Sequence, residues 1–433
     1  MPKKRSDHLK IFLGMFAGIV AGIVIRYSGL SFESIQTVVR YVKPVGDVFM
    51  RMLFMTVMPL LVSALTLGVA EIGDMRRLGR IGLRTLGFTV TVSTIAVLIG
   101  VTLTVIARPG GAISLENRRM LLERFPVSAL SDPEALKSGD RGILDTLVKI
   151  VPKNPLEDMV RAFDPSYAGG GILAVIFFSF MLGVAIALCD PEKVRGFKSA
   201  LEGLYETVMK LIAIGMKLAP LGVFSLLFSL SATMGFSILA ILFRYVAVVL
   251  AALVLHLFGV YSILLKTAGG MRPGLFFRGT ADVMLVAFST SSSNATLPTT
   301  LRTAVETLKL RRDISRFVLT LGATANQNGT ALYEGVTALF LAQCFGIPLG
   351  FMQQIFIVVL CVLAGIGTAG VPGGSLPAVM MILAGIGVPV ESLGIILGVD
   401  RLLDMSRTVV NVQGDLTAAV VVNRYEEKGV SGF

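Results

Sequence analysis

Apolar runs of about twenty residues recur along this chain, and a run of that length can cross the hydrocarbon core of a bilayer as a helix. Of the 433 residues, 54% are hydrophobic and only 15% are charged, a balance that soluble proteins rarely reach. Most of the length must therefore face lipid or other spans. The sequence predicts an all-α integral membrane protein with eight membrane spans, near 11–29, 42–71, 82–107, 170–189, 197–230, 235–265, 314–346 and 392–424.

Two further apolar stretches are interrupted by Gly, Ser and Pro, near 273–300 and 353–388. Each closes its small-residue turn on Leu-Pro, and each is followed by a helix with the pattern N-x-[NQ]-G-[TD], at 326–330 and 411–415. A broken hairpin followed by a polar-centred helix thus occurs twice. Such duplication is typical of secondary transporters built from inverted structural repeats, whose discontinuous helices meet near the bilayer midplane. Two coincidental glycine-rich breaks are the alternative.

Basic residues cluster beside the ends of the predicted spans. The net charge of +11 would suggest nucleic-acid binding in a soluble domain. Here the clusters at 3–10, 76–84 and 193–198 fall on one side of the membrane if the spans alternate in direction, and the positive-inside rule makes that side cytoplasmic. We therefore expect a cytoplasmic N-terminus, an uncleaved first span, an external polar loop at 108–169 and no nucleic-acid partner.

Cysteine and histidine usage argues against several chemistries. Cys189, Cys344 and Cys361 are isolated and are expected to be small apolar packing residues. His8 lies in the charged N-terminus, and His256 is alone in an apolar segment with no acidic residue near it in the sequence. No zinc site or organic cofactor is indicated. A Ser–His intramembrane protease is a weak alternative.

The last predicted span carries a polar stripe. At about 100° per residue, its members fall within about 80° of one another on a helix; they are Asp400, Asp404, Arg407, Asn411 and Asp415. A charged side chain at mid-membrane costs at least about 2.5–3.5 kcal/mol, so this stripe must face a partner, a ligand or water. A purely structural pair between Asp404 and Arg407 would leave Asp400 and Asp415 unexplained. The stripe therefore predicts a binding site.

Broken helices can supply the rest of such a site, because backbone that leaves a helix in lipid needs other partners. The N–H groups at 291–294 and 370–375 suit a carboxylate. A hard cation such as sodium prefers oxygen ligands, and freed carbonyls are expected around Gly322, Thr324, Asn326 and Ile366. Asn326 and Gly329 are accordingly expected to interrupt the seventh span.

Four stretches together resemble one family: SSSNATLP, GATANQNGTALYEG, GIGTAGVPGG and DRLLDMSRTVVNVQGD. The chain is similar over nearly its whole length to the dicarboxylate/amino-acid:cation symporters of bacterial or archaeal type, which have the glutamate transporter fold. The resemblance implies eight transmembrane helices, two re-entrant helical hairpins and a homotrimer in the inner cell membrane. It also implies a fixed scaffold and a transport domain that moves like an elevator, and it argues against an enzyme.

The resemblance divides the chain into a scaffold and a transport domain. Scaffold helices are expected at 1–80 and 170–230, joined to the rest by the external loop 108–169. The transport domain is expected at 81–107, 235–265, 271–300 (first hairpin), 312–346 (broken seventh helix), 353–388 (second hairpin) and 392–424. Residues 425–433 would form a cytoplasmic tail.

The resemblance also implies a substrate site. Asp404 would hold an amino group, and the guanidinium fork of Arg407 would hold a side-chain carboxylate. Asp400 and Arg401 stand behind them, and Arg401 is expected to supply the charge that archaeal members place at the position of Ser291. The implied substrate-binding residues are Ser291, Ser292, Ser293, Thr330, Val371, Gly373, Ser375, Asp404, Arg407, Thr408 and Asn411.

Two residues favour particular substrates and ions. Dicarboxylate carriers of the family replace Asp404 with a small polar residue, so its presence favours aspartate or glutamate over succinate or malate. Proton-coupled relatives carry asparagine at the position of Asp415, so its presence favours sodium. The implied cation ligands are Gly322, Thr324, Asn326, Gly365, Ile366, Thr368, Asn411 and Asp415. The alternatives left open are a proton-coupled carrier of a dicarboxylate or other organic anion on the same fold, and a channel or hydrolase.

A third cation site of sodium-coupled relatives is expected to be lost. Asn328 stands where those relatives carry aspartate, and Thr89 and Val92 replace a tyrosine and a threonine, leaving Ser93. A neutral amide gives a buried cation no counter-charge. The site formed by Ser93, Asn326 and Asn328 is therefore predicted to be empty. Two alternatives are left open: Asn328 still binds sodium weakly, or Gln327, also unusual for the family, compensates.

Overall fold

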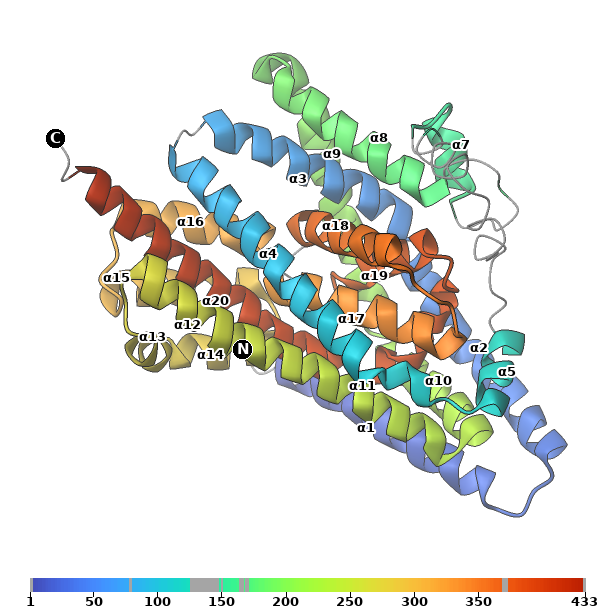
Figure 1. Cartoon of the computed structure of the whole chain (residues 1–433). Coiled ribbons are helices and arrows are strands. Elements are labelled where there is room, and N and C mark those ends of the chain that lie inside the picture. Colours follow the sequence, from blue (N-terminus) through green and yellow to red (C-terminus); the bar gives the residue numbers. More distant parts are fainter. Residues whose placement is uncertain are drawn as a thin grey trace.

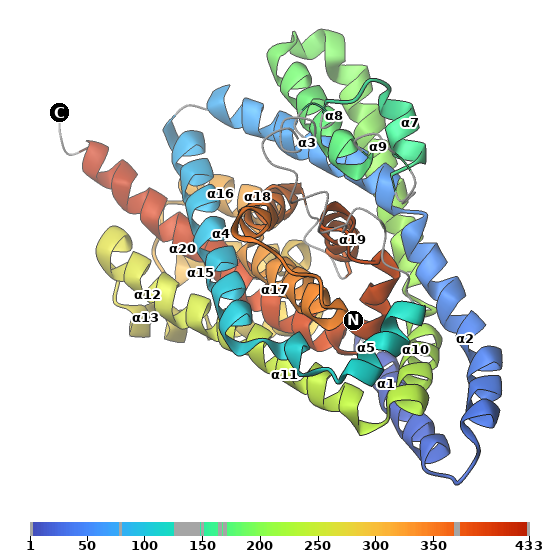
Figure 2. The same ribbon diagram turned by 45° about the vertical axis from the view of Figure 1, so that its right-hand side comes forward.

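The structure is a computed structural model that describes residues 3–77, 80–124, 148, 151–162, 167, 171–367 and 373–430, and these residues are arranged as helices joined by turns. Two groups of helices are visible in Figures 1 and 2. The outer helices run from the top of Figure 2 down its right-hand side to the lower right: α1 (Lys3–Arg26), α2 (Phe32–Phe54), α3 (Val57–Arg77), α8 (Gly171–Leu188), α9 (Pro191–Gly215) and α10 (Ala219–Met234).

The inner helices surround the long last helix, α20, which contacts α14, α16 and α17 along its length. Helix α4 packs against α17 and α18 on the other side of the group. The inner helices are α4 (Arg80–Ala107), α11 (Phe236–Val254), α12 (Tyr261–Leu264), α13 (Pro273–Gly279), α14 (Ala281–Thr290), α15 (Ser293–Glu306), α16 (Arg312–Ala325), α17 (Asn328–Phe345), α18 (Phe351–Gly367), α19 (Leu376–Gly385) and α20 (Leu397–Val430).

Several predicted spans are two helices rather than one. The stretch 42–71 falls on α2 and α3, which meet at Met55 and Thr56, and 197–230 falls on α9 and α10, which are bent by 59°. In the seventh span, α16 ends at Ala325 and α17 begins at Asn328. Hydropathy alone does not register such bends, because both halves of each pair are apolar on one side.

Within the described residues, three continuous helical stretches are long and apolar enough to cross a membrane: Phe32–Ala70, Ile81–Gly111 and Phe236–Gly269. The bent pair α9–α10 is a fourth candidate. The seventh predicted span does not qualify because it is broken between α16 and α17. The eighth does not qualify because α20 carries charged residues. An integral membrane protein follows from these helices, while the count of eight spans stays a prediction.

Helix α1 packs against α10 through glycines spaced four residues apart. A Cβ atom at Gly14, Gly18 or Gly22 would lie 2.3, 2.5 or 2.6 Å from the nearest carbonyl oxygen of α10. Small residues at this spacing let two helix backbones approach closely in lipid, where van der Waals packing replaces the hydrophobic effect as the driving force. The glycines of α1 therefore fix its position among the outer helices.

The two interrupted stretches form helix–break–helix segments. In the first, Ser291 ends α14 in the left-handed conformation with φ 48°, and Ser292 caps α15 by accepting a hydrogen bond from the backbone N–H of Ala295 (3.2 Å). Helix α15 then runs to Glu306, beyond the predicted boundary at 300. In the second, α18 and α19 flank residues 368–372, which lie outside the described residues.

Two other predicted boundaries differ from the structure. The described parts of the polar loop 108–169 include a 3-10 turn (Pro109–Ala112) and two helices, α5 (Leu115–Arg124) and α7 (Pro155–Val160). The segment 425–433, expected to be a tail, continues α20 as far as Val430. Arg84 of α4 pairs with Glu426 and lies over the ring of Tyr425, so these contacts hold the end of α20 against α4.

Helix α11 continues through two π-helical turns, Leu255–Val260 and Leu265–Gly269, with the short α12 between them. Each π turn places an extra residue in the helix and shifts the side chains that follow it. Such turns are frequent at functional sites. Here they flank Tyr261, which points its hydroxyl at α20 and donates to the backbone carbonyl of Val410 (3.0 Å).

Candidate functional site

Four charged side chains form a buried cluster on α20. Arg407 donates from Nη2 to Oδ1 of Asp404 (2.8 Å) and from Nη1 to Oδ1 of Asp400 (3.3 Å). Arg401 donates to the other oxygen, Oδ2, of Asp404 (3.0 Å). The cluster holds two arginines and two aspartates, so the charges balance. The Asp404–Arg407 pair, which the sequence analysis considered only as a structural alternative, is thus present and is extended by Asp400 and Arg401.

Tyr333 of α17 completes the cluster from a second helix. Its hydroxyl donates to Oδ1 of Asp400 (2.7 Å), and the guanidinium of Arg407 lies over its ring, 4.2 Å from the centroid. A desolvated contact of a cation with an aromatic face is worth about 2 kcal/mol or more. Tyr333, not assigned from the sequence, therefore fixes the plane in which Arg407 presents its donors.

A pocket opens beside this cluster. Asp400, Arg401 and Asp404 line it together with Gly373 at the tip of the second interrupted stretch, and apolar side chains of α1, α2 and α10 close it. The pocket thus lies where the inner helices meet the outer ones. Of its charged wall, Asp404 was assigned to substrate binding from the sequence, whereas Asp400 and Arg401 were expected to stand behind the site and here line the pocket themselves.

Three serine hydroxyls in the interrupted stretches are buried and have no hydrogen-bond partner among the described residues: Ser291, Ser293 and Ser375. Leaving a buried polar group unpaired costs about 1–3 kcal/mol. All three belong to the predicted substrate site, and Ser375 is two residues from Gly373 of the pocket. These hydroxyls are therefore available to a polar ligand.

Asn411 of α20 holds the start of α17. Its Oδ1 accepts from the backbone N–H groups of Gly329 (2.8 Å) and Thr330 (3.3 Å), and its Nδ2 donates to Gln327 Oε1 (2.6 Å) and Thr330 Oγ1 (3.0 Å). The hydroxyl of Thr408, likewise expected to contact substrate, donates to the backbone carbonyl of Asp404 (2.7 Å). In this conformation Asn411 and Thr330 are thus hydrogen-bonded to each other, and Thr408 is hydrogen-bonded to its own helix.

The break between α16 and α17 faces Asp415. Asn326 donates from Nδ2 to Oδ1 of Asp415 (2.9 Å), while its own Oδ1 is buried and has no partner in the part of the chain that the structure describes. A Cβ atom at Gly322 would lie 2.4 Å from the same carboxylate oxygen, so glycine is required for this approach. A carboxylate and an unpaired amide oxygen beside the C-terminal carbonyls of a helix are a donor set that fits a hard cation.

The other predicted cation ligands are less fully described. Gly365 of α18 lies against α17, where an added Cβ would meet Ala331 Cβ at 3.2 Å and the Gln327 carbonyl oxygen at 3.6 Å. The side chains of Thr324 and Ile366, and residues Thr368 and Val371 altogether, lie outside what the structure describes.

The residues of the predicted third cation site are only partly together. Ser93 of α4 donates to Oδ1 of Asn328 (2.6 Å), and Nδ2 of Asn328 donates to the hydroxyl of Tyr261 (3.1 Å). Asn326, the third expected member, is directed at Asp415 instead. Both functional groups of the Asn328 amide are thus used in a neutral chain of hydrogen bonds between α4 and α12.

Glu334 of α17 was missed by the sequence analysis. The side chain is fully buried, and neither carboxylate oxygen has a hydrogen-bond partner among the described residues. An ionised carboxylate in such surroundings costs several kcal/mol, so the site favours the protonated acid. The available signal was a lone acidic residue in the apolar helix 328–345.

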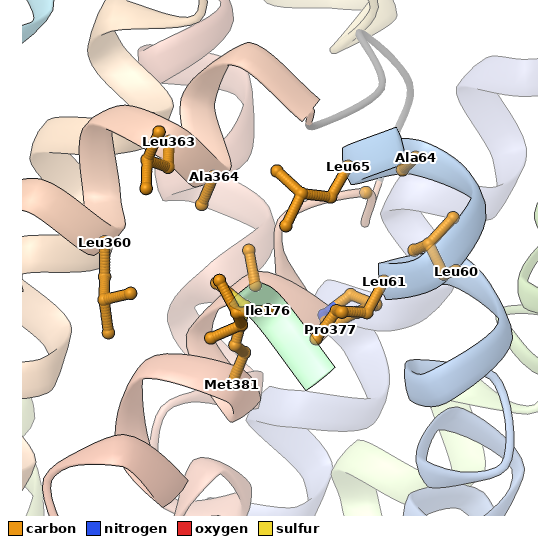
Figure 3. Close-up of a pocket in the computed structure, with 12 residues that line it drawn as sticks. Leu60, Leu61, Ala64, Leu65, Ile176, Leu360, Leu363, Ala364, Pro377 and Met381 are labelled. Carbon is orange, nitrogen blue, oxygen red and sulfur yellow. The ribbon is translucent and has the colours of Figure 1, made fainter. Parts of the chain in front are cut away.

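A second, larger pocket is entirely apolar. Figure 3 shows it between α3 and α8 on one side and α18 and α19 on the other, with Leu61, Leu65, Ile176 and Met381 directed into it. Its described lining carries no charged side chain and consists of apolar side chains and Gly374. This pocket marks an aliphatic contact between outer and inner helices and not a second substrate site.

Comparison with known proteins identifies the family. The sequence profile of the sodium:dicarboxylate symporter family matches residues 8–425. The chain is 32% identical over 420 residues to the proton/glutamate-aspartate symporter of Escherichia coli K12, covering 97% of this chain and 92% of that protein. It is 33% identical to the proton/sodium-glutamate symport protein of Bacillus subtilis 168, covering 96% and 92% of the two chains.

Human excitatory amino acid transporter 3 is also similar, with 31% identity over 453 residues that cover 96% of this chain and 86% of the human protein. Family and relatives are symporters and not enzymes, which confirms the resemblance expected from the four motifs. The buried charges of α20, the break before α17 and these matches lead to one conclusion: this chain is a membrane transporter that belongs to the sodium:dicarboxylate symporter family.

Proposed function

We propose that the protein takes up aspartate or glutamate together with sodium as a secondary active symporter. The observation that carries this proposal is the buried Asp404–Arg407 pair. Asp404 lines a pocket together with Gly373, which is two residues from the Ser375 hydroxyl, and this hydroxyl has no hydrogen-bond partner among the described residues. Relatives named for glutamate and aspartate symport support the choice of substrate. The test is accumulation of labelled aspartate, glutamate and succinate in proteoliposomes.

An acidic amino acid can exchange partners with this pair. Its side-chain carboxylate would take the place of Asp404 on Arg407, and its ammonium would take the place of Arg407 on Asp404. The side-chain carboxylate, the ammonium and both members of the pair then keep an opposite charge, so the desolvation already incurred by the pair is not repeated. The α-carboxylate, which is the substrate's net charge, would be left to the hydrogen-bond donors of the interrupted stretches. Succinate has no ammonium, and its binding would leave Asp404 facing a second carboxylate.

We assign the coupling sodium to the break between α16 and α17. Asp415, the Asn326 side-chain oxygen and the carbonyls near Gly322 would hold the ion, with Gly365 of α18 close to the Gln327 carbonyl. When bound, sodium supplies the positive charge that a buried Asp415 lacks. Asn326 holds Asp415 on one side of this break, and Asn411 holds the first backbone N–H groups of α17 on the other. The cation site and the start of α17 are therefore positioned by neighbouring hydrogen bonds.

The movement that we propose is an elevator. The outer helices would form the scaffold of a homotrimer in the inner cell membrane, and the inner helices would form the transport domain. The segments 271–300 and 353–388 would be re-entrant hairpins in a protein with eight transmembrane helices and a cytoplasmic N-terminus. The aliphatic contact of α3 and α8 with α18 and α19 supports this division, because such surfaces slide without breaking directional bonds.

Proton coupling is the second candidate, and Glu334 is the observation that favours it. A buried carboxyl group without a partner can carry a proton in one state of the cycle and release it to water or to a cation in another. Relatives whose names include both proton and sodium support keeping this candidate.

Sodium dependence has two diagnostic variants. Uptake of aspartate is expected to require a sodium gradient, and Asp415→Asn is expected to remove that requirement or the uptake itself, since the buried cation loses its counter-charge. Glu334→Gln is expected to keep sodium-driven uptake. The measurement is accumulation with a sodium gradient, and with a pH gradient in choline, for all three proteins.

Equal accumulation in choline with a pH gradient contradicts sodium coupling and supports the second candidate. In that case Glu334→Gln, which cannot release a proton, should abolish accumulation while Asp415→Asn retains it. The two variants thus respond in opposite ways under the two candidate functions.

Fewer cations are expected per substrate than in relatives that use three sodium ions. The amide of Asn328 is engaged by Ser93 and Tyr261 and carries no charge, so the third cation would lack a counter-ion. Reversal potentials in proteoliposomes give the stoichiometry, and Asn328→Asp is expected to raise it. Three sodium ions per substrate in the unmodified protein would refute this prediction.

A further inference from the structure

Gln327 bridges the break of the seventh helix with its side chain. Its Nε2 donates to the backbone carbonyl of Ala323 in the last turn of α16 (3.0 Å), and its Oε1 accepts from Nδ2 of Asn411 on α20 (2.6 Å). Gln327 and Asn411 are both buried. One carboxamide therefore satisfies a helix-end carbonyl and fixes the side chain that in turn holds the start of α17.

The groups that Gln327 joins are those that a cation would otherwise organise. The last carbonyls of α16 have no intrahelical donor and carry the negative end of the helix dipole, so they need a donor or a positive ion. Asn411 must keep one orientation to accept from the N–H groups of Gly329 and Thr330. An amide N–H at Ala323 supplies the donor without an ion.

We propose that Gln327 is a positioning residue that pre-assembles the broken seventh helix in the absence of cations, by holding Ala323 and Asn411 in one hydrogen-bonded bridge. With Gln327 present, the ordered arrangement of the substrate site depends less on bound sodium than it would if an apolar side chain stood at this position. This role rests on the proposed cation coupling, and it means that the protein's own hydrogen bonds order the break before a cation binds.

A matched pair of substitutions isolates the bridge. Gln327→Met removes both hydrogen bonds at nearly constant volume. Gln343→Met makes the same change on the same helix, where Gln343 donates to the Thr104 carbonyl (3.1 Å) and accepts from the Gly110 N–H (3.1 Å), away from the break. Thermal unfolding of the purified full-length proteins is measured in sodium chloride and in choline chloride of equal ionic strength, without substrate.

In choline, Gln327→Met is expected to have a lower Tm than the unmodified protein, and sodium should raise its Tm by more. Sodium should raise the Tm of Gln343→Met by the same amount as that of the unmodified protein. Aspartate affinity of Gln327→Met should fall by about tenfold at low sodium, as expected for two lost hydrogen bonds, and recover at saturating sodium. An equal sodium effect in all three proteins, or an affinity loss independent of sodium, would overturn the proposal.

Hydrogen exchange of the unmodified protein gives a second readout that needs no variant. The amides of Gly329 and Thr330 should exchange slowly in choline, because Asn411 already accepts from them. Fast exchange in choline that slows only with sodium would also overturn the inference. Absence of any aspartate or glutamate binding would contradict the proposed substrate, while the Tm and exchange measurements would still decide the role of Gln327.

Discussion

Arg407→Ala is expected to abolish binding and uptake of acidic amino acids. The substitution removes the guanidinium fork that would hold the substrate carboxylate and leaves Asp400 and Asp404 without their shared cation. Losing one partner of a desolvated charge pair costs about 2–5 kcal/mol or more, roughly thirty-fold to several thousand-fold in affinity. Isothermal titration with aspartate measures the loss directly.

Two further variants separate binding from folding. Arg407→Lys keeps the charge for both aspartates but not the planar fork or its contact with Tyr333, so the protein should fold and bind aspartate more weakly. Arg311→Ala removes an exposed pair with Asp313, worth about 0–1 kcal/mol, and should change neither property. Unchanged aspartate affinity in Arg407→Ala would show that the arginine serves only the internal cluster.

Asp404→Ser is expected to change selectivity from amino acid toward dicarboxylate. The variant loses the anion that would pair with a substrate ammonium, so aspartate affinity should fall by tens to thousands of fold. Succinate should lose far less, because serine no longer opposes its second carboxylate. Competition of both ligands against labelled aspartate and labelled succinate measures the ratio.

The same variant also removes the partner of Arg401 and Arg407, which makes a control necessary. Asp404→Asn keeps the shape and one acceptor oxygen for these arginines, and it should shift selectivity in the same direction. Equal losses for aspartate and succinate in both variants would indicate that Asp404 acts within the charge cluster and not on the ammonium.

The polar stripe of α20 was predictable because it lies on one helix. Periodicity alone placed Asp400, Asp404 and Arg407 together, and the structure joins them by hydrogen bonds. The helical period alone could not predict the contact of Asn326 with Asp415, because it does not determine which helix a break faces. There the paired motifs at 326–330 and 411–415 indicated that the two segments meet.

Other features could not be predicted from pattern. The bend between α9 and α10 joins an amphipathic helix to an apolar one, and its sequence signal is only the Pro near the start of α10. The bridge of Gln327 depends on side-chain orientation across three segments, which no spacing rule specifies. Glu334 had a signal, a single acid in an apolar helix, but nothing in the sequence showed that it would lack a partner.

The neutrality of the α20 cluster has an electrical consequence. A charge that crosses the membrane field exchanges about 2.3 kcal/mol per 100 mV, but two arginines and two aspartates that travel together exchange nothing. Asp415 hydrogen-bonds a neutral amide, so when it is ionised and no cation is bound it adds one net negative charge to the moving helices of the proposed elevator. An inside-negative potential drives that charge outward and is expected to speed the reset of the empty carrier, which transient capacitive currents can record.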